Sequence, residues 1–274
     1  MNLDISFGQY CEGKSVLHRM DPRAKIIVSV LYIIVVFLAK NLWSFGLLLL
    51  SAAVLILASG ISPKIILKGM KALTFIIIFT SVINIFWMKG ETLLFSLGFV
   101  SVYLEGILNA IMIALRIIVL LIGTSVFMTY TTTPIALTDG LEQLLAPLKK
   151  LHLPVHEFSM MMTIALRFIP TLIEETQKIM NAQKARGADF ASGSLMKRAK
   201  TLIPILVPLF ISAFRRAEEL ATAMECRCYT GGDGRTRMNV LHASPKDVVL
   251  CILLVLLGMV VIFTNGLGGY SLSW

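Results

Sequence analysis

Charged residues are scarce in this sequence. They make up 15% of its 274 residues, whereas hydrophobic residues make up 57%. Soluble domains carry about 25% charged and about 45–50% apolar residues, so the composition is typical of a membrane protein. The formal net charge of +9 does not indicate a nucleic-acid-binding protein, because the basic residues lie between apolar runs, where the positive-inside rule accounts for them. We therefore expect no nucleic-acid partner.

Metal-binding and disulfide patterns are also lacking. Of the four cysteines, Cys226 and Cys228 are one residue apart, with no second pair of thiols or histidines at zinc-site spacing. Two histidines fall within residues 152–157 (HLPVHE), but the order is not H-E-x-x-H, and Pro154 interrupts the helical face that such a pair needs. The first residues contain no basic stretch followed by an apolar core, so no cleaved signal peptide is expected. We expect no metal and no cofactor.

Long apolar runs are the main feature that is present. A membrane span needs about 20 apolar residues, so the first run is short, and its flanking Lys25 and Lys40 must extend toward water. Just before it, Asp21 and Pro22 are typical of the start of a helix. The pattern predicts an all-α integral membrane protein with about five transmembrane helices and a region of long amphipathic helices. The five runs are residues 26–39, 42–59, 72–88, 106–128 and 248–263.

Basic residues set the expected orientation. The segment before the first run and the segment between the second and third runs are rich in Lys and Arg, which places both in the cytoplasm. Residues 129–247 return to the cytoplasm and hold 15 of the 25 Lys and Arg and 11 of the 16 Asp and Glu. The chain thus divides into residues 1–128 (an arm and four spans), 129–247 (the cytoplasmic insert) and 248–274 (a final span and tail). We expect a multi-pass protein of the cell membrane.

The cytoplasmic insert contains two amphipathic helices. Pro170 should kink the first helix without necessarily ending it. The second contains residues 202–214, an uncharged run that is too short to span comfortably, which predicts a buried or interfacial segment. In the first helix, apolar residues recur at helical spacing: Phe158, Met161, Met162, Ala165, Phe168, Ile169, Leu172 and Ile173.

Both helices of the insert run into an arginine between small residues. The first ends at residues 185–187 (ARG) and the second at residues 226–228 (CRC), and the two arginines are 41 residues apart. One interpretation is that each arginine offsets the negative end of a helix dipole and that Gly187 is a C-terminal cap. The other is that small neighbours let each helix end enter a groove, where the arginine binds a carboxylate or a helix C-terminus of a partner.

One segment near the start of the sequence matches a nucleotide-binding pattern. Residues 8–15 (GQYCEGKS) match the phosphate-binding pattern G-x-x-x-x-G-K-[ST], but that chemistry needs a strand before the loop and a helix behind it. Only seven residues precede Gly8, and Pro22 follows soon after, so we expect no nucleotide site.

Arg116 lies near the middle of the fourth run, where charge is costly. We favour a structural partner for it, either Glu105 or a backbone carbonyl, over substrate binding.

Several spaced motifs resemble one family. The stretches are residues 18–25 (HRMDPRAK), 166–170 (LRFIP), 185–187 (ARG), 223–229 (AMECRCY) and 231–236 (GGDGRT). They resemble the energy-coupling factor transporter transmembrane component, the scaffold subunit of vitamin and metal-ion importers. The similarity covers nearly the whole chain.

The resemblance implies that the insert is a coupling region with two coupling helices. Each would end in an X-Arg-X motif that docks into one of two ABC-type ATPase subunits. ATP hydrolysis would belong to those partners, so this chain would carry no catalytic residue. The second motif departs from the Ala-Arg-Gly that the family often has, and its two thiols would make docking sensitive to oxidation. The implied docking residues are Ala185, Arg186, Gly187, Cys226, Arg227 and Cys228.

The resemblance also implies a second membrane partner, the substrate-binding S component. Methionine is frequent, with 14 residues, and flexible thioethers suit a surface that accepts several partners. Vitamins would be the first expected cargo and transition-metal ions the second. The residues expected to contact the S component are Met161, Met162, Phe168 and Leu172.

Two other function classes remain as alternatives. A membrane-embedded enzyme acting on lipid or isoprenoid substrates would need clustered carboxylates, a Ser/His pair or a metal site near a membrane face. A self-contained secondary transporter would need ionisable residues or broken helices near the bilayer midplane, and Arg116 alone qualifies.

Overall fold

The structure is a computed structural model, and its described residues fall into two compact units. The first unit lies within Met1–Leu144 and Val240–Trp274, and the second lies within Leu145–Asn239. The predicted division at residues 128 and 247 stays a prediction. The described residues are 10–11, 13, 15–88, 92–97, 100–151, 154–188, 190, 194–232, 241 and 244–266.

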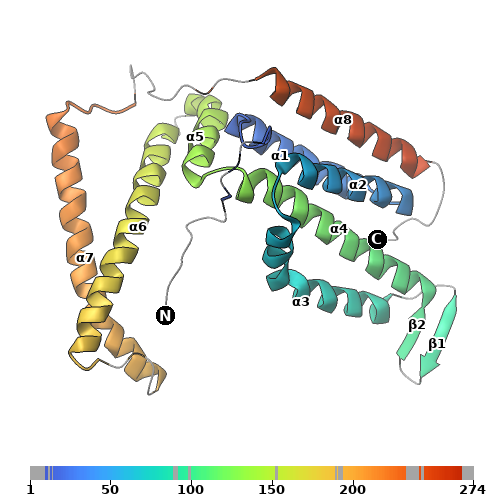
Figure 1. The fold of residues 1–274 in the computed structure, drawn as a ribbon, viewed down its shortest axis with the longest axis horizontal. Helices are drawn as coiled ribbons and strands as arrows, with labels where there is room; N and C mark the ends of the chain where they lie inside the picture. Colours follow the sequence, from blue (N-terminus) through green and yellow to red (C-terminus); the bar gives the residue numbers. More distant parts are fainter. Residues whose placement is uncertain are drawn as a thin grey trace. The chain divides into compact units, whose positions relative to one another are not determined.

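Helices make up most of the first unit. Figure 1 shows α1 and α2 between α8 on one side and α4 on the other, and α3 packs against α4. A six-residue π-helical segment, Ser125–Tyr130, continues α4 directly. The helices are α1 (Pro22–Leu38), α2 (Leu42–Ser59), α3 (Pro63–Trp87), α4 (Leu104–Thr124), α5 (Pro134–Leu145) and α8 (Pro245–Gly266).

Three described helical segments are long and apolar enough to cross a membrane: Leu42–Ser59, Leu104–Tyr130 and Pro245–Gly266. A fourth follows if the two parts of α3, which are bent by 63°, form one span. The 17 residues of α1 measure about 25 Å, somewhat less than the roughly 30 Å of hydrocarbon. The all-α membrane fold is confirmed, while the count of five spans stays a prediction.

One short β-hairpin interrupts this helical pattern. Strands β1 (Leu93–Leu97) and β2 (Val100–Tyr103) pair antiparallel between α3 and α4. In the sequence, this stretch lies between the apolar runs 72–88 and 106–128. Its aromatic and β-branched residues suit a strand, but the segments are too short for a distinct periodic pattern.

The first unit has a close-packed core. Asp21 caps α1 as expected, because its side chain accepts from the backbone N–H of Arg23 at 2.8 Å. Deeper in the core, the fully buried rings of Tyr32 and Phe127 meet edge to face with centroids 5.9 Å apart. Gly123 allows this approach, because a Cβ there would collide with the Tyr32 ring.

Arg116 pairs with a backbone carbonyl. Its Nη2 donates to the oxygen of Ala39, the C-cap of α1, at 2.7 Å, and its guanidinium lies 5.8 Å from the Phe37 ring centroid and 5.5 Å from that of Phe45. Glu105 accepts from Thr92 instead. The backbone carbonyl is thus one of the two expected partners, and the structural role of Arg116 stays a prediction.

The same end of α1 is joined to the last helix. The Asn265 side chain donates to the Leu38 oxygen at 2.7 Å and accepts from the Lys40 backbone N–H at 3.1 Å. Ser44 at the start of α2 also donates to Asn265, at 2.9 Å. These bonds hold the end of α8 against the turn between α1 and α2.

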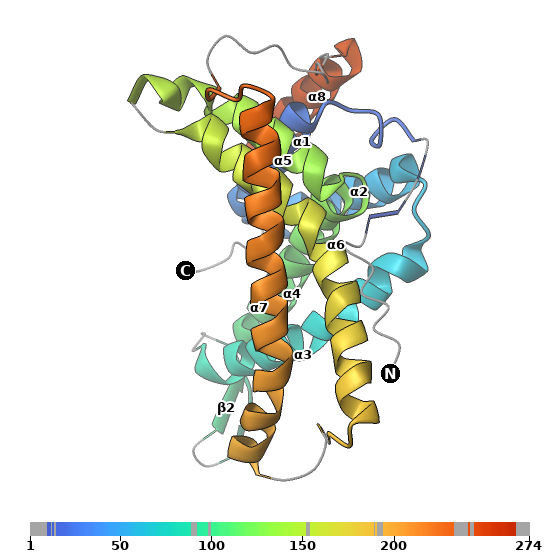
Figure 2. The same ribbon diagram turned by 90° about the vertical axis from the view of Figure 1, so that its left-hand side faces the viewer.

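The second unit contains the long helices α6 (Val155–Ala185) and α7 (Leu195–Cys226), preceded by a 3₁₀ segment, Ala146–Leu151. Figures 1 and 2 show α6 and α7 side by side and running in opposite directions. Pro170 lies inside α6 without ending it, as expected. Two prolines lie inside α7 in the same way.

Part of the phosphate-loop lookalike and of the histidine motif lies outside the described residues. Residues 8–9, 12 and 14 of the first and residues 152–153 of the second belong to this group, as do residues 233–236 of the last family motif. In the described part of the lookalike, Ser15 is engaged locally, with its hydroxyl 2.7 Å from Nδ1 of His18. His156 lies in the first turn of α6.

Candidate docking site

The first arginine motif forms a specific helix end. Arg186 is the C-cap of α6, and Gly187 follows with a φ of +86°. The Gly187 N–H donates to the Lys184 oxygen at 2.9 Å, and the Ala188 N–H donates to the Gln183 oxygen at 3.0 Å. This pair of bonds is the Schellman motif, which satisfies carbonyls at a helix C-terminus. The interpretation of Gly187 as a cap is confirmed.

The second arginine motif forms the same end on α7. The Cys228 N–H donates to the Glu225 oxygen at 2.8 Å, and the Tyr229 N–H donates to the Met224 oxygen at 3.1 Å. Cys228 occupies the position of Gly187 with a φ of +55°, and among the described residues it is the one non-glycine with positive φ. A side chain in this conformation costs about 1–2 kcal/mol. The geometry of the helix end is therefore retained here despite backbone strain.

Both arginines consequently stand at equivalent positions, each directly before a left-handed residue. The residues around them, Ala185, Gly187, Cys226 and Cys228, are exposed, as are Arg186 and Arg227. In the part of the chain that the structure describes, no acidic side chain pairs with either guanidinium. Because backbone hydrogen bonds cap each helix end, neither arginine side chain is needed as a cap. Both guanidinium groups are therefore available to a partner.

An ion pair joins the two helices. Nη2 of Arg216 in α7 lies 3.1 Å from Oε2 of Glu175 in α6. Glu175 precedes Arg186 by eleven residues, and Arg216 precedes Arg227 by eleven residues. At about 1.5 Å per residue, each arginine stands about 16 Å along its helix from the shared contact. The two helix ends thus lie at equal distances, measured along their helices, from this ion pair.

The sequence alone does not predict this ion pair. The 41-residue offset that aligns the two arginine motifs also aligns Glu175 with Arg216, so the information was present in the sequence. A charge pair between two helices cannot be told from two solvent-exposed charges without knowing which faces meet.

Apolar side chains are exposed on both helices. Met161 is 57% exposed and Met162 is 39% exposed, while Phe168 and Leu172 are partly covered. The predicted buried or interfacial run of α7 is largely exposed in this chain alone, with Ile205 as its buried member. So much exposed apolar surface is typical of a membrane or protein contact. The exposed apolar residues of α7 are Met196, Leu202, Ile203, Leu206, Val207, Phe210, Ile211 and Phe214.

Comparison with known proteins gives the family. The family model described as CbiQ, cobalt transport protein, matches residues 13–239. The energy-coupling factor transporter transmembrane protein EcfT of Ruminiclostridium cellulolyticum is 56% identical over 247 residues, which are 90% of this chain and 92% of that protein. The chain belongs to the energy-coupling factor transporter transmembrane protein family. Proteins of the same name in Clostridium kluyveri and Bacillus subtilis are 51% and 47% identical, over 91% and 93% of this chain.

Membership of the energy-coupling factor family confirms the resemblance on which the site was predicted. A transmembrane subunit of this family is a component of a transporter and is not itself an enzyme. The chain is therefore a multi-pass membrane subunit of a transport system. The family model extends over α6 and α7, which carry both arginine motifs.

Proposed function

We propose that this chain is the transmembrane scaffold, or T component, of an energy-coupling factor ABC importer. It couples ATP hydrolysis by two partner ABC-type ATPase subunits to the uptake of vitamins or other micronutrients. A substrate-binding S component in the membrane holds the cargo. The observation that carries the proposal is the pair of identical helix ends, each with an exposed arginine and no acidic partner in the described chain.

Each arginine suits a docking role because of its chemistry. A guanidinium offers a planar fork of N–H donors that binds a carboxylate through two bonds or caps a helix C-terminus. The neighbours Ala185, Gly187, Cys226 and Cys228 are small, so the helix end can enter a groove on the partner. Two equivalent ends match two similar ATPase subunits.

The exposed apolar faces of α6 and α7 suit the S component. Met161, Met162, Phe168 and Leu172 are the proposed contacts on α6, and the α7 run from Leu202 to Phe214 extends this surface. Closing of the ATPase pair would move the two arginine ends together and change the angle between the helices. That movement would tilt the bound S component so that it releases its cargo inward.

The proposed site of action is the cell membrane, with the N-terminus and the coupling region, residues 129–247, in the cytoplasm. The excess of basic residues in these segments supports this orientation. The family model bears the name of cobalt transport, which keeps metal ions as the second cargo class after vitamins. Arg116 is held by the Ala39 oxygen, which supports a scaffold over a self-contained secondary transporter.

Charge reversal at both ends tests the docking role. The Arg186→Glu/Arg227→Glu double variant should lose co-purification with both ATPases, and each single variant should weaken it, because a carboxylate repels the acceptor that the arginine binds. Lys184→Glu is the matched control, since Lys184 is also exposed at the end of α6. Wild-type recovery of both ATPases with the double variant would contradict the proposal, as would an equal loss with Lys184→Glu.

A further inference from the structure

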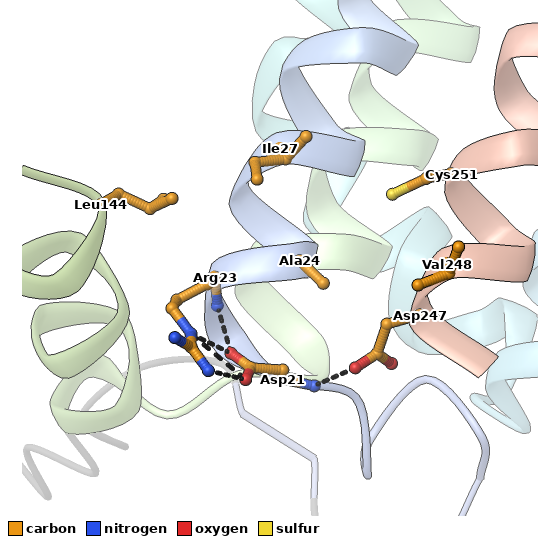
Figure 3. Close-up of a pocket in the computed structure, with 8 residues that line it drawn as sticks. All are labelled: Asp21, Arg23, Ala24, Ile27, Leu144, Asp247, Val248 and Cys251. Atoms are coloured by element: carbon orange, nitrogen blue, oxygen red, sulfur yellow. Dashed lines mark hydrogen bonds and ion pairs between the residues drawn. The ribbon is translucent and has the colours of Figure 1, made fainter. Parts of the chain in front are cut away.

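A groove lies where α1 and α8 both begin. Its volume is about 360 Å³. Ala24 and Ile27 of α1 form the floor, Leu144 of α5 stands on one side, and Val248 and Cys251 of α8 stand on the other (Figure 3). Nearly all of the lining is apolar, so the groove suits hydrocarbon.

The polar end of the groove carries the partly exposed guanidinium of Arg23, which is ion-paired with Asp21. Nη2 of Arg23 contacts Asp21 Oδ2 at 2.7 Å and donates to the Leu241 oxygen at 3.0 Å, and Nε also donates to Asp21. Among the described residues none accepts from Nη1, and the Arg23 side chain is 31% exposed. The carboxylates of Asp21 and Asp247 are buried. The fixed guanidinium therefore presents a free N–H edge beside an apolar groove.

The position of the groove matches a membrane boundary. The Asp21 N–H donates to Asp247 Oδ2 at 3.4 Å, so α1 and α8 start at the same level. Since α8 is long and apolar enough to span, this level is one edge of the hydrocarbon layer. From Ile27 an exposed apolar stripe continues along α1 through Val30, Ile34 and Phe37. The groove therefore opens toward acyl chains, and its polar end lies at the depth of lipid headgroups.

We propose that this groove binds one phospholipid molecule, with an acyl chain over Ala24 and Ile27 and the phosphate on Arg23. A guanidinium binds phosphate through charge-assisted hydrogen bonds. An apolar helix of a partner would fit the walls equally well, but it would bury the Arg23 N–H edge without an acceptor, which is costly. A phospholipid matches both the walls and the charge.

Mass spectrometry of the intact full-length chain in mild detergent tests the proposal. The wild-type chain should retain one phospholipid. Ala24→Phe fills the floor and should abolish retention, whereas Val30→Phe, on the same stripe beyond the groove, should not. Arg23→Gln should reduce retention about tenfold, the effect of losing one charge-assisted hydrogen bond. Arg19→Gln, a nearby arginine that does not line the groove, is its control.

A second measurement uses the wild-type chain alone, so it does not depend on the folding of any variant. In nanodiscs of defined lipids, phosphatidylcholine and phosphatidylglycerol should be retained alike, because the phosphate is the group they share. Diacylglycerol, which lacks phosphate, should be lost on transfer to detergent. Equal retention of diacylglycerol in this measurement would overturn the proposal, as would equal phospholipid retention by wild type and Ala24→Phe in the mass-spectrometry measurement. A lipid-free wild type, with Ala24→Phe losing a partner subunit, would assign the groove to a protein helix instead.

Discussion

At the scale of single residues, Cys228 has the least favourable backbone conformation of the described chain. Its φ of +55° supports the helix end that places Arg227, yet a left-handed non-glycine residue is strained. A glycine at the equivalent position of α6 adopts the same conformation without this cost. The second arginine is therefore held by a more strained turn than the first.

Replacing this residue by glycine should stabilise the chain. We expect Cys228→Gly to raise the free energy of unfolding by about 1 kcal/mol, because the strain exceeds the entropy that glycine adds to the unfolded chain. Thermal unfolding in detergent measures the change. Cys226→Gly, inside the last helical turn, is the control and should lower stability by about 0.5 kcal/mol. A destabilised Cys228→Gly would show that the thiol makes a contact that outweighs the strain.

Arg116 is a second residue whose role can be measured. Arg116→Met removes the bond to the Ala39 oxygen and the contacts with Phe37 and Phe45. The free energy of unfolding should fall by about 2–3 kcal/mol, because a charge-assisted bond is lost in an apolar surrounding. Arg167→Met, at an exposed arginine of α6, should change stability little. Full stability combined with lost transport would instead place Arg116 on the path of the cargo.

At the scale of elements, the long helices α6 and α7 are joined by the ion pair between Glu175 and Arg216. Glu175 and Arg216 are 24% and 38% exposed as side chains, so their ion pair is worth little in stability, about 0.5–1 kcal/mol. We expect its importance to lie in register, because both arginine ends lie eleven residues along their helices from it.

A double-mutant cycle with Glu175→Gln and Arg216→Gln tests this register. The coupling energy in unfolding should be about 0.5–1 kcal/mol. ATP-dependent uptake should fall markedly in the variants although their stability changes little, because the ion pair that relates the two arginine ends is lost. The cycle of Glu174→Gln and Arg215→Gln, exposed neighbours without a described ion pair, should show no coupling. Zero coupling in the first cycle would rule out this account of the register.

The sequence predicts the elements whose causes are local. Asp21 and Pro22 predict the start of α1, and apolar periodicity predicts α6, because caps and helical faces depend on a few neighbouring residues. The short hairpin before α4 escaped prediction because its strands are too short for a distinct periodic pattern. The 63° bend of α3 escaped it because apolar periodicity does not report the angle between the two parts of a helix. For the apolar run of α7, sequence allowed burial or an interface, and its exposure in this chain favours an interface.

At the scale of the whole molecule, the orientation of the chain in the membrane is the prediction with the widest consequence. A membrane-impermeant maleimide should label Cys228 in intact cells only after permeabilisation, whereas Lys40→Cys, in a background lacking the native cysteines, should be labelled from outside. Both positions are exposed, so the difference reports on topology. Labelling of Cys228 in intact cells would place the coupling region on the wrong side for cytoplasmic ATPases.

The first and last helices of the membrane unit are joined at both ends. Asp21 and Asp247 connect their beginnings, and Leu38 and Asn265 connect their ends. Translation produces α6 and α7 before α8. Both arginine ends therefore leave the ribosome before α8 can pack against α1. During biogenesis, a nascent chain thus displays its docking ends before its membrane unit is closed. Under the proposed docking role, both ends are then open to ATPase subunits before α8 inserts.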